Sequence, residues 1–468
     1  MGFSCYILVH LGKSSFLQEP DIKDDKVRAF FVCLGEGQAT QKRERKMIEA
    51  NVPYKNLKVL SLFSGCGGMD LGFEGGFICH RKSINPDSGW VDSQLDEQWI
   101  RVRQTRFKTC FANDILREAR LAWTHFFKQF NYDASVYHPE SIVDLVKAQK
   151  AGHLIFPNEV DVVTGGFPCQ DFSVAGKRNG FESWKDHNGK TRTADEPTEE
   201  TRGKLYYWMK QTIDIVKPKI FVAENVKGLV TLKDVKDIIR KDFSSADGNG
   251  YIVLAPRVLH AGDYGVPENR ERVFFIGIRK NELTAEARTA LISDTVPEEY
   301  DPYPKPTHAY TFQGENLLPY VTCADVFKDL EEPHCSSDAS QQSFSKAKYM
   351  GKHCQGQTEI KINGLGPTIR SEHHGNIEYR RLSFEHGGTN IEELKRGLQE
   401  RRLSVRECAL IQTFPPDYPF VWKECINGET FSLNASGGYK VIGNAVPPVL
   451  AYNIAMRLQE LWSKYFGI

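Results

Sequence analysis

The chain of 468 residues has no long hydrophobic run. No stretch approaches the ~18 consecutive apolar residues that a membrane-spanning helix needs. The opening MGFSCYILVHLGKSS has no charged leader before its short apolar segment, so it does not follow the pattern of a secretory signal. We therefore expect a soluble, cytoplasmic protein that has no membrane partner.

The sequence also lacks an excess of charge of either sign, because 60 Lys and Arg balance 60 Asp and Glu. This balance excludes a histone-like, polybasic protein. It does not exclude a nucleic-acid partner, since phosphate binding depends on the local charge of one face and not on the net charge.

Paired cysteines are absent as well. The 11 cysteines are scattered and none forms a C-x-x-C motif, so neither a disulfide framework nor a zinc ribbon is indicated. The pairs His334-Cys335 and His353-Cys354 match no zinc-ligand spacing, and we expect no metal site. Reduced thiols are the expectation, which leaves a single cysteine free for chemistry.

Short apolar runs of strand length alternate with helical patterns along the first part of the chain. The predicted strands lie at 58–63, 109–113, 160–166, 219–225, 251–256 and 272–278. Helical patterns at Ile115–Phe127 and Leu205–Val216 separate some of them. This alternation predicts an α/β protein with an open, mostly parallel sheet.

Other segments depart from this pattern. Residues 1–56 read as an N-terminal extension, and two polar insertions interrupt the alternation at 80–106 and 177–203. From about 281 to 400 the alternation is lost, which indicates a second, irregular domain. The chain then ends in an apolar helix, Val449–Phe466, suited to docking onto a core.

A glycine turn, FSGCGG, follows the first predicted strand. Small residues at the carboxyl end of a sheet let a cofactor approach the backbone. A dinucleotide fingerprint would need another glycine where Asp70 stands, so phosphate cradling is not indicated. An adenosyl ligand fits better, with Asp114 accepting from the ribose hydroxyls and Ile115 flanking the adenine. A plain tight turn remains the alternative interpretation.

Three further motifs lie at the ends of predicted strands, and the first two of them share one predicted edge of the sheet. Cys169, in GGFPCQ, follows a buried strand, although a lone cysteine is more often a small core residue. Glu224 follows IFVA, where burial would raise its pKa and make it a donor to a ring nitrogen; an N-cap acid is the alternative. Arg270 and Arg272 supply guanidinium groups, although such a run is also common on solvated surfaces.

Together, a thiol, a protonatable glutamate, an arginine and an adenosyl cofactor suggest methyl transfer to an unactivated ring carbon. A thiolate that adds to C6 of cytosine, with protonation at N3, creates an enamine that can attack a sulfonium methyl group. Loss of the C5 proton then expels the thiolate. Because this chemistry needs access to both ring faces, a duplex substrate must have its base flipped out.

Six sequence blocks in order resemble the DNA (cytosine-5) methyltransferases over about 58–464. They are LFSGCGG, GGFPCQ, ENV, PENRERVFFIG, RRLSVRECALIQTFP and GYKVIGNAVPPVLA. The resemblance implies a Rossmann-like sheet dependent on S-adenosyl-L-methionine, with a second, smaller, irregular target-recognition domain. It further implies double-stranded DNA as substrate and a bacterial type II restriction–modification system. A cognate restriction endonuclease would then exist without a stable complex, and we expect a monomer because one chain can methylate one strand at a time.

The same resemblance implies a division of the chain after the extension. Residues 57–280 would form the catalytic and cofactor-binding domain, and 281–400 the target-recognition domain, here called the recognition region. Residues 401–468 would return to complete the catalytic domain.

Site residues carry over from the family motifs position by position. The resemblance implies Cys169 as nucleophile, Glu224 as the N3 donor, and Arg270 and Arg272 around the base and the acid. The implied cofactor contacts are Phe63, Ser64, Gly65, Cys66, Gly67, Gly68, Asp114, Ile115, Ser141, Pro168, Leu205, Asn444 and Ala445. The predicted DNA contacts are Lys177, Arg178, Arg370, Asn376, Arg380 and Arg381.

Two positions depart from the family pattern. Ser141 stands near the place where the family usually has an aspartate, and Glu268 stands where it commonly has glutamine. Two other functions stay open at this point: methylation of an RNA cytosine by the same chemistry, and a catalytically silent DNA-binding regulator on the same fold.

Overall fold

A computed structural model describes residues 55–168, 205–231, 234–310, 317–371, 375–426 and 428–468. Residues Asn56–Ile468 pack as one compact unit. The predicted contacts Cys169, Lys177 and Arg178 lie outside the described residues, as does most of the N-terminal extension.

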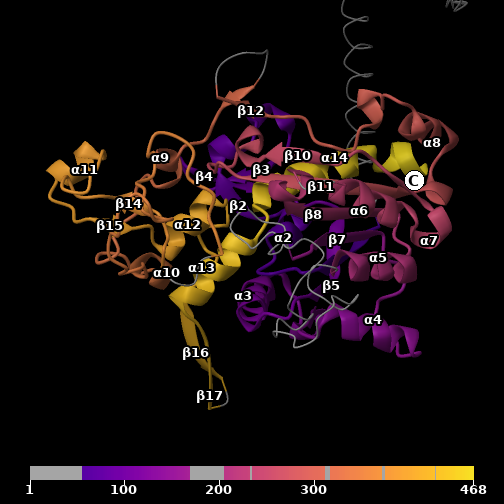
Figure 1. Ribbon diagram of the computed structural model, residues 1–468, viewed down its shortest axis with the longest axis horizontal. Helices are drawn as coiled ribbons and strands as arrows, with labels where there is room; N and C mark the ends of the chain where they lie inside the picture. Colours follow the sequence, from indigo (N-terminus) through magenta and orange to yellow (C-terminus); the bar gives the residue numbers. More distant parts are fainter. Residues whose placement is uncertain (1–54, 169–204, 232–233, 311–316, 372–374, 427) are drawn as a thin grey trace, which may run out of the picture. The chain divides into compact units, whose positions relative to one another are not determined.

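The centre of this unit is a mixed sheet in the order β10-β11-β8-β7-β1-β5-β6, with β9 also paired to β11 (Figure 1). Its strands are β1 (Leu57–Leu62), β5 (Phe107–Asn113), β6 (Tyr137–His138), β7 (Val162–Gly166), β8 (Ile220–Val226), β9 (Tyr251–Val253), β10 (Arg257–His260) and β11 (Glu271–Arg279). The pairs among β6, β5, β1, β7 and β8 are parallel. The pairs that β11 makes with β8, β9 and β10 are antiparallel. The predicted α/β fold is confirmed, with an antiparallel edge added to the parallel part.

Both faces of the sheet are covered, because side chains alternate between two apolar clusters along each buried strand. In β1, Val59 belongs to one cluster and Leu60 to the other, and in β8 the same holds for Val222 and Phe221. This is the burial expected of a parallel strand with helices on both sides. The helices are α2 (Gly68–Glu74), α3 (Arg117–Phe127), α4 (Ile142–Lys150), α5 (Leu205–Val216), α6 (Val235–Ser244), α7 (Ala246–Asn249), α8 (Ala285–Ile292) and α14 (Pro448–Phe466).

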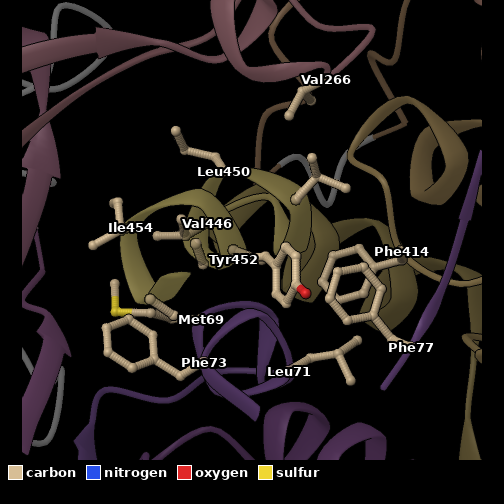
Figure 2. Packing of buried hydrophobic residues seen from close by; sticks show 14 of the residues in the cluster. Met69, Leu71, Phe73, Phe77, Val266, Phe414, Val446, Leu450, Tyr452 and Ile454 are labelled. Carbon is tan, nitrogen blue, oxygen red and sulfur yellow. The ribbon is translucent and has the colours of Figure 1, made fainter. Parts of the chain in front are cut away.

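The last helix, α14, packs against α2 from the start of the described chain (Figure 2). Figure 2 shows Leu450, Tyr452 and Ile454 of α14 facing Met69, Leu71 and Phe73 of α2. Close approach depends on Gly72, because a Cβ there would overlap Ala451 and the carbonyl of Pro448. The predicted helix at Val449–Phe466 is thus confirmed and docks on the core.

The polar insertion after the first block forms a small sheet of its own in the order β2-β4-β3. Its strands are β2 (Ile78–His80), β3 (Val91–Gln94) and β4 (Trp99–Val102). Trp90 and Phe77 both make edge contacts with Tyr452 of α14, with ring centroids 5.7 and 5.8 Å apart. The insertion is therefore part of the fold and not a surface decoration.

The recognition region has few regular elements among its described residues. They are β12 (His308–Ala309), β13 (Leu318–Pro319), α9 (Cys323–Val326), α10 (Ala339–Gln342), β14 (Tyr379–Arg381) and α11 (Ile391–Lys395). Its first part packs on the sheet domain, since Tyr303 donates to the carbonyl of Phe274 at 2.9 Å and Thr284 N donates to Tyr465 O at 2.8 Å. The return segment adds β15 (Arg401–Arg402), α12 (Val405–Ile411), β16 (Trp422–Ile426), β17 (Glu429–Leu433) and α13 (Ala435–Asn444).

Candidate active site

Residues predicted for catalysis lie at one edge of the sheet. Gly166, at the end of β7, pairs with Glu224 of β8, and β11 runs antiparallel beside them. The Nε atom of Arg272, on β11, lies 2.9 Å from Oε1 of Glu224. Gly166 allows this arrangement, because a Cβ there would lie 2.7 Å from Oε2 of Glu224. The predicted Glu224 and Arg272 therefore meet in space.

The segment that leads to the predicted nucleophile is fixed at the same edge. The side-chain amide of Asn225 donates to the carbonyl of Phe167 at 3.0 Å, and its oxygen accepts from Val226 N at 2.9 Å. Pro168, next along the chain, is half-buried. Asn225 thus connects the end of β8 to the backbone directly before the predicted cysteine.

Glu224 lies in an environment that favours its neutral form. Burial raises the pKa of this carboxyl, and the positive charges of Arg272 and Arg270 oppose the shift in part. A carboxyl group whose pKa is raised by burial holds its proton more readily than an exposed glutamate and can donate it to a ring nitrogen.

Arg270 has a different environment from Arg272. Its side chain is fully buried, and it donates to the carbonyls of Ile369 at 2.9 Å, Gly443 at 2.9 Å and Ala445 at 2.8 Å. Glu268 completes the arrangement, since its Oε1 accepts from the backbone N–H of Ile369 at 2.6 Å. Its guanidinium thus joins three backbone segments inside the protein, and the prediction that Arg270 and Arg272 lie around the base and the acid stays a prediction for Arg270.

The glycine turn between β1 and α2 is packed on one side and open on the other. Gly67 has φ +81°, and a Cβ there would press on Trp123 and Phe127 of α3. A Cβ on Gly68 would overlap the carbonyl of Val446, so the turn touches the last sequence block directly. At Gly65, in contrast, a Cβ would meet no atom of the described residues within 4 Å. The open side of the turn is therefore at Phe63, Ser64 and Gly65.

Cys66 contributes its backbone and not its thiol to this turn. The thiol is buried and donates to Val441 O at 3.3 Å, and burial raises its pKa. The carbonyl of Cys66 accepts from the hydroxyl of Tyr418 at 2.7 Å. The turn is thereby attached to the return segment.

Asp114 stands beside the turn at the end of β5. Its carboxylate accepts from Gly65 N at 3.1 Å and from Leu116 N at 2.9 Å. A carboxylate has about four acceptor positions and no donor, so it is the type of group that accepts from ligand hydroxyls. The next residue, Ile115, is 40% exposed, as expected of a side chain that would lie against a flat ring.

The other predicted cofactor contacts are spread around the same end of the sheet. Ser141 is buried and its hydroxyl accepts from Val143 N at 3.3 Å, which makes it the N-cap of α4. Leu205 is buried at the start of α5. Asn444 is exposed at the end of α13, and Ala445 follows it with its carbonyl bound to Arg270.

The donor set fits an adenosyl cofactor. The turn at Phe63–Gly65 opens to free space, and a carboxylate stands beside it on the neighbouring strand. Sheets of this kind bind ligands at the carboxyl ends of their strands. Phe63, Gly65, Asp114 and Asn444 are the residues placed to hold such a group.

Sequence reasoning missed one residue beneath this turn, Asp70. Its carboxylate accepts from Ser61 Oγ at 2.5 Å and from Trp123 Nε1 at 2.8 Å. Ser64 Oγ in turn lies 2.9 Å from Ser61 Oγ, so the chain of hydrogen bonds reaches the turn. Burial raises the pKa of Asp70 to about 7. The signal for Asp70 in the sequence was an acidic residue within an apolar helix.

The predicted DNA contacts in the recognition region have mostly internal partners. Arg380 is buried and paired with Glu393, and Arg381 is buried between Glu393 and Glu332, at 2.8 and 2.7 Å. Arg370 binds Glu378 at 2.9 Å and also donates to the backbone carbonyl of Asn376. Arg380 and Arg381 are therefore assigned to the interior of the recognition region rather than to its surface.

The polar insertion bridges the sheet domain and the recognition region. Lys82 pairs with Asp325 at 2.6 Å, and Gln98 donates to Asp329 at 2.8 Å. His308 Nε2 lies 2.8 Å from the carbonyl of Lys82. The insertion thus braces the recognition region against the sheet.

The described ranges lack two further features. No helix there is long and apolar enough to cross a membrane. No group of three or more His, Cys, Asp and Glu residues in those ranges is arranged to hold a metal ion.

The fold and the edge geometry define a class: a Rossmann-like α/β protein with an acid–arginine pair beside a cofactor turn. The family model of the C-5 cytosine-specific DNA methylases matches residues 57–460. The chain is 31% identical to the type II methyltransferase M.BsuRI of Bacillus subtilis, over 85% of this chain and 78% of that protein. It is 30% identical to the type II methyltransferase M.BspRI of Lysinibacillus sphaericus, over 97% of this chain and 94% of that protein.

A crystal structure of the S. pombe Dnmt2 methyltransferase aligns with a TM-score of 0.48 and 17% identity, over 87% of this chain and 99% of that chain. On the family match, the chain belongs to the C-5 cytosine-specific DNA methylase family. It is therefore a DNA (cytosine-5) methyltransferase.

Proposed function

We propose that this chain transfers the methyl group of S-adenosyl-L-methionine to C5 of a cytosine flipped out of duplex DNA at one specific site. The proposal places the protein in a bacterial cytoplasm, as a monomer that protects DNA from a cognate restriction endonuclease. The relatives named type II methyltransferases support this setting. The observation that carries the chemistry is the buried Glu224 held 2.9 Å from Arg272 beside the Pro168 segment.

In this proposal each residue at the active site has a separate role at the cytosine base. Cys169 adds its thiolate to C6, and Glu224 holds the proton that N3 receives. Arg272 fixes the orientation of the Glu224 carboxyl and keeps its donor oxygen at the ring. When bound, S-adenosyl-L-methionine supplies an electrophilic methyl group on a sulfonium.

The cofactor would be held at the open side of the glycine turn. Phe63, Ser64 and Gly65 offer backbone groups there, and Asp114 offers acceptor oxygens for the ribose hydroxyls. Cys66, Gly67 and Gly68 support the turn from behind. Pro168, Leu205, Ser141, Asn444 and Ala445 complete the proposed surroundings.

The test is methyl transfer by the full-length protein with labelled S-adenosyl-L-methionine and unmodified genomic DNA, followed by bisulfite sequencing. We expect protected cytosines confined to one short motif. Glu224→Gln should lower the rate at least about 100-fold, the usual range for removing a general acid. Cys169→Ala should abolish transfer.

Matched controls are Glu286→Gln and Cys335→Ala, which change an exposed glutamate and an exposed cysteine. Both should keep full activity. Transfer to RNA with none to DNA would overturn the proposed substrate, and full activity of Cys169→Ala would overturn the mechanism.

A further inference from the structure

The recognition region carries a short segment, 343–352, with three exposed lysines. Lys346, Lys348 and Lys352 all lie on the surface. No ion pair joins any of them to a residue that the structure describes, whereas Arg370, Arg380 and Arg381 each have a carboxylate partner. Lys346 lies over the ring of Phe344, 3.3 Å from its centroid, and this contact leaves its charge uncompensated.

The backbone of this segment is held from inside the protein. Arg402, only 1% exposed, donates through Nε to Ala347 O at 2.9 Å and through Nη2 to Lys348 O at 3.3 Å. Its guanidinium lies 4.2 Å from the ring centroid of Tyr379 on β14. A buried arginine is thus used to fix the chain that carries the lysines.

Other contacts fix both ends of the segment. Ser345 Oγ donates to Gly375 O at 2.7 Å, and Met350 N donates to the buried Gln357 side chain at 2.9 Å. Tyr349 stacks on His386, with ring centroids 4.3 Å apart. The lysine side chains have no ion-pair partner among the described residues while their attachment points are ordered, which lowers the entropy lost when a ligand binds.

This segment is also connected to the active-site edge. Gly443 must be glycine, because a Cβ there would overlap the backbone at Arg370 and Ser371. The adjoining Ile369 is held by Arg270 at 2.9 Å. Arg370 donates to the carbonyl of Asn376 at 2.9 Å, and Ser345 is bonded to the neighbouring Gly375. The segment that carries the lysines is thus bonded to the part of the recognition region that abuts the last sequence block.

We propose that Lys346, Lys348 and Lys352 form a phosphate-binding surface for the backbone of the DNA duplex. This inference rests on the proposed function. It assigns DNA contacts to these lysines in place of the predicted contacts Arg380 and Arg381. The three charges gather on one ordered segment of a chain whose net charge is zero. Such phosphate contacts position the duplex without reading its sequence.

The experiment measures binding of a fluorescent duplex to the full-length protein at several NaCl concentrations. Each phosphate contact contributes about 0.9 to the slope of log K against log salt. The variant K346A/K348A/K352A should therefore lower the slope by about 2 to 3 and weaken binding at least tenfold at 0.1 M salt. Preference for the cognate site over other duplexes should stay unchanged.

Two controls separate this effect from general charge loss and from misfolding. Lys128→Ala and Lys236→Ala remove exposed lysines outside the recognition region and should leave the slope unchanged. The variant K346R/K348R/K352R should restore the wild-type slope. A wild-type slope in the alanine variant, with methylation retained, would overturn the proposal that the three lysines bind phosphates. The proposed function would be unaffected by that result. Absence of DNA methylation by the wild type would instead overturn the proposed function.

Discussion

Arg270 directly precedes β11 and Arg272 lies on it, but their side chains meet different partners. Arg272 faces the Glu224 carboxyl at 2.9 Å, and Arg270 binds three buried carbonyls. At the residue scale, substitution of each arginine with lysine can therefore distinguish their roles. Lysine keeps the positive charge but lacks the planar guanidinium that donates several hydrogen bonds at once.

We expect Arg270→Lys to lower the free energy of unfolding by about 2–4 kcal/mol, because buried carbonyls lose their donors. Arg272→Lys should change stability by less than about 1 kcal/mol and lower the methylation rate at least tenfold. Chemical denaturation and a methyl-transfer assay on both variants check this. Equal stability of the two variants would contradict the division of roles.

Asp70 gives a second prediction at this scale, through pH. Its pKa is raised from 3.8 to about 7, so its contribution to stability is complete below about pH 4 and is lost as pH rises to about 7. Asp70→Asn keeps acceptors and donors for Ser61 and Trp123 but cannot ionise. Between pH 5 and pH 8 the wild type should lose about 2–3 kcal/mol more stability than the variant.

Denaturation of both proteins at the two pH values measures the difference. Parallel pH profiles of stability would show that Asp70 does not titrate in this range.

At the scale of elements, an ion-pair network joins β15 and α12 of the return segment to β14 of the recognition region. Glu332 accepts from Arg381 at 2.7 Å and from Arg401 at 3.0 Å, and Arg401 also binds Glu407 at 2.8 Å. The two guanidiniums hold the pKa of Glu332 down at about 2. These elements are too short to be stable alone, so the network adds to the apolar contacts through which α12 joins the main core.

We expect Glu332→Gln to destabilise the protein by about 2–4 kcal/mol, because two buried guanidiniums lose one carboxylate. Its contribution is present above about pH 4.5 and is lost as pH falls toward 2, so the difference from wild type should shrink in acid. The neighbouring Glu331 is exposed, and Glu331→Gln is the matched control. Equal melting of the two variants at pH 7 would show that the network does not stabilise the fold.

At the scale of the whole described unit, one apolar cluster passes through all three predicted segments. It contains Val59 of β1, Val321 and Ile369 of the recognition region, and Leu450 of α14. A shared core of this kind favours cooperative unfolding over separate melting of the parts.

We therefore expect the backbone amides of β14 and of β1 to exchange with solvent through the same opening reaction. Hydrogen exchange followed by mass spectrometry in increasing denaturant measures both. Loss of protection in β14 at clearly lower denaturant than in β1 would show that the recognition region unfolds on its own.

The sequence by itself determined the alternation of strands and helices, the docking helix at the end of the chain and the family. Each follows from local patterns: apolar runs of strand length, a helical period of apolar residues, and short blocks in fixed order. These patterns placed Glu224 at the carboxyl edge of the sheet, because parallel strands end at the same side. Arg272 opens β11 and reaches that edge only because β11 runs antiparallel to β8, a direction that the patterns did not predict.

Only the tertiary structure decided which charged residues face inward. Arg270, Arg380 and Arg381 look like ligand contacts in the sequence, yet carboxylates and carbonyls remote along the chain surround them. The role of the polar insertion was likewise set by contacts such as Lys82 with Asp325. The sequence alone does not distinguish an arginine that binds a phosphate from an arginine that binds a buried glutamate. What distinguishes the two cases is the burial and the partner that folding brings to it.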